Sequence, residues 1–146
     1  MATEPNAAVN LFWKVHPKVY RWSKGRIGGS IMGFPVLLLI TTGRRSGLQR
    51  TKALMYLPHG DAFVVVASAL GQPAHPAWWL NLEADPNALV EIRGSRLPVQ
   101  AREAEGEERE ALWRAFIEKS DAYAQYQTQT TRRIPMVVLE RRPARK

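Results

Sequence analysis

Residues 34–57 read "FPVLLLITTGRRSGLQRTKALMYL", and this segment sets the architecture of the chain. Its opening run, "FPVLLLITT", is too apolar and too short for anything but a buried strand. A turn with two glycines follows, and residues 50–57 predict a second strand that returns beside the first. A strand, a tight turn and a returning strand indicate an antiparallel sheet.

Further strands are predicted on the C-terminal side of this segment. "PHGD" is a turn signal that leads into "AFVVVAS", residues 62–68, a third buried strand that completes a meander. "NALVEIRG" and "RLPVQAREAE" predict two strands joined at Gly94–Ser95, and "IPMVVLE" predicts the last strand. Six strands with local connections and few helices predict a mainly β fold, a six-stranded antiparallel barrel with added helices.

Three segments predict helices. Residues 7–22 have an amphipathic pattern that bends at Pro17, with a basic second face, and a short helix follows His75, a candidate helix cap. Residues 106–127 predict one helix that buries Leu112 and Phe116, with Trp113 as a further candidate, and its acidic first turn suits the helix dipole. The expected organisation is an N-terminal helix and glycine-rich connector (1–33), a barrel domain (34–141) and a basic tail (142–146).

Composition narrows the function classes. The chain has 146 residues, enough for one domain with a core, and contains no cysteine, which excludes disulfides and thiolate metal sites and favours a cytoplasmic location. The longest apolar run, residues 34–40, is too short to cross a bilayer. The histidines are His16, His59 and His75, whose positions do not predict a metal site.

The net charge of +8 is unevenly distributed. Residues 1–52 contain nine basic residues and one acidic residue, which gives 9 − 1 = +8, whereas the remaining 12 basic and 12 acidic residues cancel. A basic half of this kind suits nucleic acid, anionic lipid or a polyanionic small molecule.

The turn "TTGRRSGLQR" is the main candidate for anion binding. Gly43 and Gly47 allow a tight bend that directs Arg44, Arg45 and Arg50 outward beside free backbone amides. The turn has neither the Gly-Lys-Ser/Thr ending of a Walker loop nor dinucleotide-binding glycine spacing, so nucleoside triphosphates are disfavoured. A solvated basic turn is the competing interpretation.

Three segments in order, "LLLITTGRRSGLQRTKALMYL", "VVVASALGQPAHPAWWLNLEADPNALVEI" and "YAQYQTQTTRRIPMVVLE", resemble the deazaflavin-dependent nitroreductase family of the flavin/deazaflavin oxidoreductase superfamily. The resemblance covers about residues 34–140. It implies a split β-barrel and the cofactor coenzyme F420, a deazaflavin that carries a phosphodiester and a polyglutamate tail. Such a tail is the kind of polyanion that the arginine turn would bind.

The resemblance also implies roles for individual residues. The expected contacts to the phosphate and tail are Arg44, Arg45, Ser46 and Arg50, and the expected contacts along the deazaflavin are Leu54, Met55, Ala67, Ser68, Trp78 and Asn81. Met55, Tyr123 and Tyr126 are expected to contact the substrate, and Ser68 or Tyr126 to act in catalysis. The chain departs from the family pattern at Ala69, where a basic residue is common, and at Met55 and Ser120, where some members have tyrosine.

Structural roles compete with several of these assignments. Trp78 and Trp79 lie on one short helix, so either can be a core residue. Ser68 can simply end a strand. Tyr123 and Tyr126 share one helical face and can pack against the barrel.

The implied reaction is hydride transfer from reduced F420 to an electron-poor acceptor: a quinone, a conjugated enone or lactone, or a nitroaromatic. A hydroxyl of Ser68 or a tyrosine would donate a hydrogen bond to the acceptor oxygen. The alternatives are a split-barrel protein that binds FMN or a tetrapyrrole, and a nucleic-acid-binding module. The aromatic residues of segment 12–22 read as one helix face, which disfavours nucleic acid.

Two expectations concern assembly and location. The N-terminal helix, with aromatic and basic residues, is expected to contact an anionic membrane surface or to cover the pocket. A partly open barrel of this size is compatible with a monomer or a homodimer.

Overall fold

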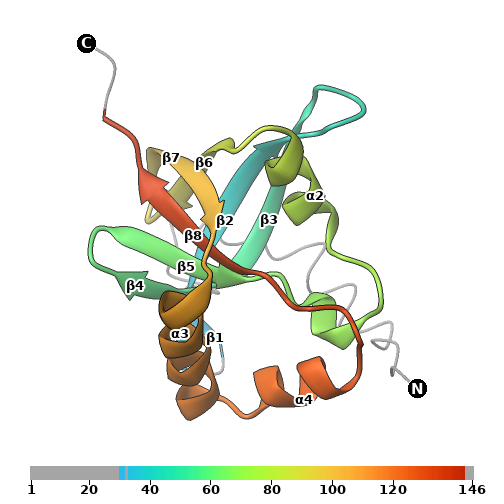
Figure 1. The fold of residues 1–146 in the computed structure, drawn as a ribbon. Coiled ribbons are helices and arrows are strands. Elements are labelled where there is room, and N and C mark those ends of the chain that lie inside the picture. The colour runs from blue at the N-terminus through green and yellow to red at the C-terminus, as the bar shows by residue number, and fades with distance from the viewer. Residues whose placement is uncertain (1–29, 32, 144–146) are drawn as a thin grey trace.

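A computed structural model describes residues 30–31 and 33–143, which form one curled antiparallel sheet with helices at its edges (Figure 1). The described part of the chain contains eight strands, and the six expected strands are all among them. The split-barrel prediction is therefore confirmed. The predicted N-terminal helix at 7–22 lies outside the described residues.

The elements have the following bounds. The strands are β1 (Ser30–Ile31), β2 (Phe34–Thr42), β3 (Gln49–Met55), β4 (Leu57–His59), β5 (Ala62–Val66), β6 (Asn87–Ile92), β7 (Ser95–Glu103) and β8 (Met136–Arg141). The helices are the short 3-10 helix η1 (Ala69–Gly71), α2 (Ala77–Ala84), α3 (Gly106–Lys119) and α4 (Ala122–Thr128). None of the described helices is long and apolar enough to span a membrane.

The predicted second strand is divided at Tyr56. Its first part, β3, pairs with β2 in the register Leu37↔Leu54, whereas its second part, β4, pairs with β5. The Tyr56 amide donates to the Pro35 carbonyl at 3.0 Å, which continues the β2–β3 register by one residue, and β4 begins at Leu57. The meander is present, but the predicted second strand is divided between two pairings, one with β2 and one with β5.

The β6–β7 turn differs by one residue from its prediction. The two strands end in the pair Ile92↔Ser95, so Arg93 and Gly94 form the turn, and the predicted Gly94–Ser95 turn is wrong. Both turn residues have positive φ, 50° and 82°. A two-residue turn with this geometry matches the right-handed twist of the flanking strands, and the strand pairing therefore decides which residues form it.

Alternation along the strands produces two large cores and a small third cluster of Val36, Leu38 and Ala53. Inward-facing residues of β2, β5 and β8 pack with α2 inside the barrel, including Leu39, Val65 and Leu139. The opposite faces of β5 and β8 pack against α3 and α4 through Phe116 and Tyr123. Since β2 is buried along both faces, its continuous apolar run follows directly from its central position.

The single helix predicted at 106–127 is two helices. The chain becomes extended at Ser120, with φ −156° and ψ 122°, so α3 ends before it and α4 begins after it. The Ala122 amide donates to the Ser120 hydroxyl at 3.4 Å, which helps α4 to start in a new direction. The predicted burial of Leu112 and Phe116 is confirmed, with exposures of 8% and 0%, whereas Trp113 is only partly buried.

An ion-pair network fastens α3 to the sheet. Arg102 of β7 donates to both carboxylate oxygens of Glu108 at 2.6 and 2.9 Å and to Glu140 of β8 at 2.7 Å. His59 of β4 lies 3.2 Å from the same Glu108 carboxylate. The hydrogen bond from Arg102, followed by the one from His59, lowers the pKa of Glu108 to about 2.

The depressed pKa predicts a defined dependence of stability on pH. Glu108→Gln should lower the free energy of unfolding by about 1 kcal/mol near neutral pH, a modest value because both partners are partly exposed to solvent. The stabilisation by the carboxylate is present above the unfolded-state pKa of 4.5 and is lost as the pH falls toward about 2. Urea unfolding at pH 7 and pH 3 measures this, with exposed Glu107→Gln as the matched control. Equal behaviour of the two variants would contradict the prediction.

Candidate active site

The β2–β3 connection is a compact turn held by its own backbone. The Gly43 amide donates to the Leu48 carbonyl at 2.8 Å, and the Gly47 amide donates to the Gly43 carbonyl at 2.8 Å. Gly47 has φ +72°, and a Cβ at Gly43 would come within 2.7 Å of the Ser46 hydroxyl oxygen. Gly47 is therefore favoured by its left-handed backbone, whereas a side chain at Gly43 would displace the Ser46 hydroxyl, and the turn presents Arg44 and Arg45 at its exposed end.

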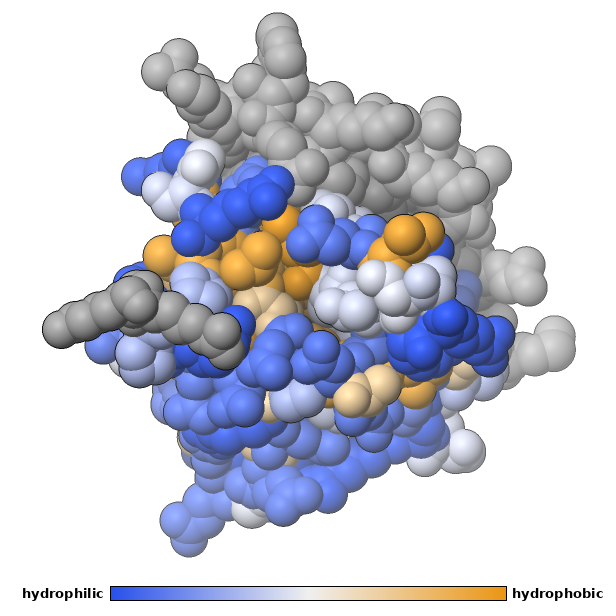
Figure 2. Space-filling view, turned by 90° about the horizontal axis from the view of Figure 1, so that it is seen from above, coloured by the Kyte–Doolittle hydropathy of each residue, from blue (hydrophilic) through white to orange (hydrophobic). Residues whose placement is uncertain are grey.

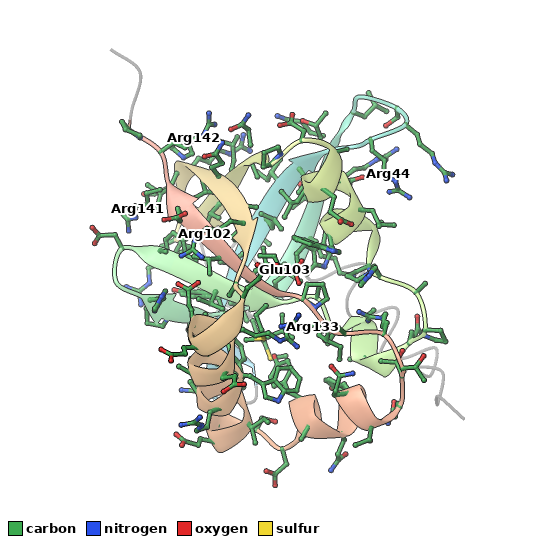
Figure 3. All side chains as sticks on the ribbon, in the orientation of Figure 1. Arg44, Arg102, Glu103, Arg133, Arg141 and Arg142 are labelled. Carbon is green, nitrogen blue, oxygen red and sulfur yellow. The ribbon has the colours of Figure 1, made fainter. Side chains whose placement is uncertain are left out.

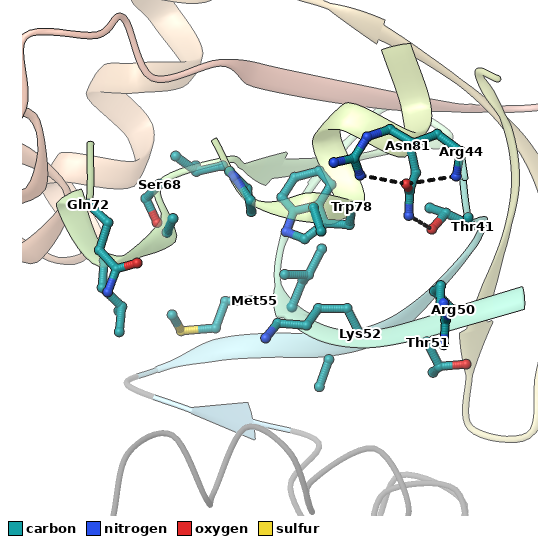
Figure 4. Close-up of a pocket in the computed structure, with 18 of the residues that line it drawn as sticks. Thr41, Arg44, Arg50, Thr51, Lys52, Met55, Ser68, Gln72, Trp78 and Asn81 are labelled. Atoms are coloured by element: carbon teal, nitrogen blue, oxygen red, sulfur yellow. Dashed lines mark hydrogen bonds between the residues drawn. The ribbon is translucent and has the colours of Figure 1, made fainter. Parts of the chain in front are cut away.

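Arg44 is oriented by a buried amide from α2. The Asn81 side-chain oxygen accepts from the Arg44 backbone amide at 3.1 Å and from the Arg44 guanidinium at 3.2 Å (Figure 4). The Asn81 side-chain nitrogen donates to the Thr41 hydroxyl at 3.1 Å. Asn81 is only 4% exposed, so α2 and the arginine turn are joined by a protected polar contact.

The space beside β3 is a cavity of about 840 Å³, within the usual range of small-molecule sites, roughly 300–1,000 Å³. Eleven of the twelve site residues expected from the sequence line it: Arg44, Arg45, Ser46, Arg50, Leu54, Met55, Ser68, Trp78, Asn81, Tyr123 and Tyr126. The exception is Ala67, which is fully buried in the barrel core. Residues from four separate segments thus meet in one place.

The cavity has chemically different ends. Figure 4 shows Arg44 and Arg50 at one end, Ser68 and Gln72 at the other, and Trp78 and Lys52 between them. The Arg50 guanidinium donates to the Ser46 hydroxyl at 3.4 Å, which keeps both residues at the arginine end. The arrangement offers several cationic donors at one end, with Trp78 and Lys52 across from each other in the middle (Figure 4).

The described surface seen from above is largely hydrophilic (Figure 2). Figure 2 looks down on the top of the molecule, where hydrophilic residues cover most of the visible described surface and hydrophobic residues occupy a smaller area between them. In Figure 3, Arg44 lies beside α2, far from Arg102 and Arg141 on the other side of the sheet. Arg102 and Arg141 have protein partners, the carboxylates of Glu108 and Glu140 for Arg102 and the Asp61 carbonyl for Arg141.

The two tryptophans of α2 have different surroundings. Both are 6% exposed and both belong to the barrel core, but only Trp78 lines the cavity. Trp78 therefore serves as core residue and cavity wall at once. Helical periodicity alone could not distinguish them, because α2 has only eight residues and buries both tryptophans.

Hydroxyl groups gather at the end opposite the arginines. Ser68 precedes η1 and makes no side-chain cap hydrogen bond there. Tyr123 packs edge to face against Phe34, Phe116 and Tyr126, and it also lines the cavity. Burial raises the pKa of both Tyr123 and Tyr126 above the usual value of 10, so both phenols remain protonated donors at neutral pH.

Comparisons with known proteins show the family and the fold of this chain. The family model described as F420H(2)-dependent quinone reductase matches residues 12–141. The chain belongs to this family. An F420H(2)-dependent quinone reductase of Mycobacterium tuberculosis is 39% identical over 143 residues, which covers 95% of this chain and 95% of the relative.

Two solved structures give the same assignment of fold. An F420-H2 dependent reductase is 42% identical, with a TM-score of 0.66, and covers 73% of this chain and 94% of that one. A chain described as a domain-swapped dimer is 37% identical, with a TM-score of 0.67, and covers 87% of this chain and 97% of that one.

The cavity fits the chemistry of the cofactor that the family name implies. A polyanionic tail requires several cationic donors in an accessible place, which Arg44, Arg45 and Arg50 provide together with Ser46. A planar ring system requires apolar surface, and Leu54, Met55 and Trp78 are among the residues that line the cavity.

Several lining residues were not expected from the sequence. Thr41, Thr51, Lys52 and Gln72 all line the cavity of this F420H(2)-dependent quinone reductase family member. Lys52 is the most consequential, because burial lowers its pKa and its side chain lies across the cavity from Trp78 (Figure 4). In the β2–β3 pairing, Lys52 lies opposite Leu39, so the Lys52 side chain is on the same sheet face as the buried Leu39.

Proposed function

We propose that this protein transfers a hydride from reduced coenzyme F420 to a quinone-type acceptor. The observation that carries the proposal is the continuity of one cavity, which joins an arginine end to an end lined by Ser68, Tyr123 and Tyr126. An elongated acidic coenzyme and a planar acceptor need this combination of surfaces. Enones, lactones and nitroaromatics remain further candidate acceptors, because they also accept hydride.

The reduced deazaflavin, when bound, supplies the hydride. The chain's own residues would bind the coenzyme, align it with the acceptor and shield both from water. Arg44, Arg45 and Arg50 would hold the phosphodiester and the acidic tail, while Trp78 and Leu54 would support the ring and exclude water. Ser68 or Tyr126 would donate a hydrogen bond to the acceptor oxygen as negative charge develops on it, and the proton would come from this hydroxyl or from solvent.

Cofactor titration tests the proposal directly. Oxidised F420 and FMN are titrated against the purified protein and followed by fluorescence, and oxidation of reduced F420 is then measured with a short-chain quinone. Preferential binding of F420 with quinone-dependent turnover is expected. Tighter binding of FMN or a tetrapyrrole would favour the alternative cofactor, and a gel shift at physiological salt without F420 binding would favour the nucleic-acid alternative.

Ser68→Ala tests the proposed hydrogen-bond donor. Loss of one donor to a developing oxyanion typically lowers kcat by about 10²–10³-fold, so a fall of at least about tenfold is expected even if Tyr126 compensates in part. The affinity for F420 should change little, since the tail contacts lie at the other end of the cavity. Steady-state kinetics with the short-chain quinone measures the effect, and unchanged kcat would remove this role from Ser68.

Assembly and location are separate parts of the proposal. The domain-swapped dimer formed by a relative that is 37% identical supports a homodimer here, which light scattering in solution tests against a monomer. Peripheral contact of the predicted N-terminal helix with the cytoplasmic face of an anionic membrane would bring the enzyme near lipid-soluble quinones within that membrane. Co-sedimentation with anionic vesicles tests this contact. If the protein shows no salt-sensitive binding to the vesicles, the contact is excluded.

A further inference from the structure

Arg132 connects the segment before β8 to the loop that carries Ser68. Its guanidinium donates to the carbonyls of Ala67 at 3.1 Å, Ser68 at 2.7 Å and Gln72 at 3.0 Å. It also lies 3.0 Å from Nδ1 of His75. The N-cap residue of α2 is Pro76, so the expectation that His75 caps this helix is wrong. One side chain thus contacts four points of the loop 67–75.

This loop needs an external constraint. Ala69 and Leu70 have φ values of 45° and 56°, in the left-handed region that residues with side chains adopt only under strain. A loop of this kind relaxes unless its surroundings hold it. The planar guanidinium of Arg132 has five donors in fixed directions, so it can hold several carbonyls at once.

The segment that carries Arg132 is itself fixed to α4. The Gln127 side-chain nitrogen donates to the Arg132 carbonyl at 2.8 Å, and the Gln127 side-chain oxygen accepts from the Ile134 amide at 3.2 Å. Gln127 directly follows Tyr126 in α4. A series of hydrogen bonds therefore runs from Gln127, the neighbour of Tyr126, through Arg132 to the loop that carries Ser68.

We propose that Arg132 is a positioning residue that fixes the separation between Ser68 and the Tyr123–Tyr126 wall, and so sets the geometry of the acceptor end of the cavity. Arg132 does not line the cavity. It acts through the loop backbone and contacts neither ligand. The inference rests on the proposed function for the identity of the acceptor, whereas the holding of the loop by Arg132 can be measured without any cofactor.

The test compares Arg132→Ala and Arg132→Lys with a control, Arg133→Ala, which removes a neighbouring exposed arginine. In Arg132→Ala, kcat with the short-chain quinone should fall by about 10- to 100-fold, because a displacement of about 1 Å at a reacting group can cost this much. The Kd for F420 should stay within about threefold, because the tail arginines are unaffected. Lysine has a single donor nitrogen and cannot reach all four acceptors, so Arg132→Lys should give an intermediate loss.

Amide hydrogen exchange supplies the readout that needs no cofactor. Exchange at residues 67–75 should become about tenfold faster or more in Arg132→Ala, with the sheet unchanged, and added guanidinium ion at millimolar concentration should partly restore kcat. Unchanged exchange and kcat would overturn the proposal. Faster exchange throughout the sheet, with parallel losses of kcat and F420 affinity, would also overturn it, because it would assign Arg132 to general stability.

The outcomes remain distinguishable from failure of the proposed function. If the unmodified protein does not bind F420, the proposed function fails, while the exchange measurement still decides whether Arg132 holds the loop. If Arg132→Ala does not fold, Arg132→Lys carries the test. Faster exchange limited to 67–75 with a lower kcat then supports the proposal, and behaviour like the unmodified protein overturns it.

Discussion

Replacing both Arg45 and Arg50 with alanine is expected to weaken binding of oxidised F420 by about 10²- to 10⁴-fold. Each charge-assisted hydrogen bond to a phosphate or carboxylate contributes roughly 1.5–3 kcal/mol, and about 1.4 kcal/mol corresponds to a tenfold change in Kd. Both arginines are exposed at the turn, and both line the cavity. Their loss should therefore affect the tail contacts while leaving the barrel intact.

The matched control removes the same charge elsewhere. Arg114→Ala combined with Arg133→Ala takes two exposed arginines from outside the cavity lining and lowers the net charge equally. Fluorescence titration at two salt concentrations separates local contacts from the general field, because screening at higher salt weakens long-range attraction in both variants. Equal losses of affinity in the two double variants would show that net charge, and not the turn, binds the coenzyme.

Local sequence patterns were sufficient to predict most strands of the fold. The buried strands are recognisable because β-branched and apolar residues in short runs have few other stable arrangements, and the six expected strands are all present. The break at Ser120 and the one-residue shift of the β6–β7 turn depend on how neighbouring elements pack and pair. Such tertiary preferences override local propensity, so a single sequence does not encode them visibly.

The candidate site was predictable to the extent that its residues lie in recognisable motifs. The arginine turn and the segments around Ser68 and Trp78 were identified, and the cavity brings them together. The use of the Asn81 amide was not predictable, because its contacts with Thr41 and Arg44 span 40 and 37 residues. Arg132 is a similar case, since its acceptors are mostly backbone carbonyls of a loop about 60 residues earlier. A backbone carbonyl can accept a hydrogen bond whatever its side chain is, so such contacts cannot be recognised from residue types.

The second large effect is expected at Gly71, where η1 meets α4. A Cβ at Gly71 would lie 2.9 Å from the Tyr126 carbonyl oxygen and 3.0 Å from the Tyr126 Cα, and the residue has φ +79°. Backbone atoms cannot move aside as a flexible side chain can, so Gly71→Ala should push α4 away from the Ser68 loop. The expected destabilisation is about 2–5 kcal/mol, the sum of left-handed backbone strain and overpacking.

Gly60→Ala separates strain from the clash. Gly60 has a similar φ of +59°, but a Cβ there would meet no atom within 4 Å, so only the strain of about 1–2 kcal/mol is expected. Urea unfolding and quinone kinetics measured on both variants should show a larger loss of stability for Gly71→Ala and a fall in kcat of about 100-fold that Gly60→Ala lacks. If the two variants lose equal stability and both retain kcat, the close approach of η1 to α4 does not set the distance between Ser68 and Tyr126, and the acceptor end of the cavity must be held by other contacts.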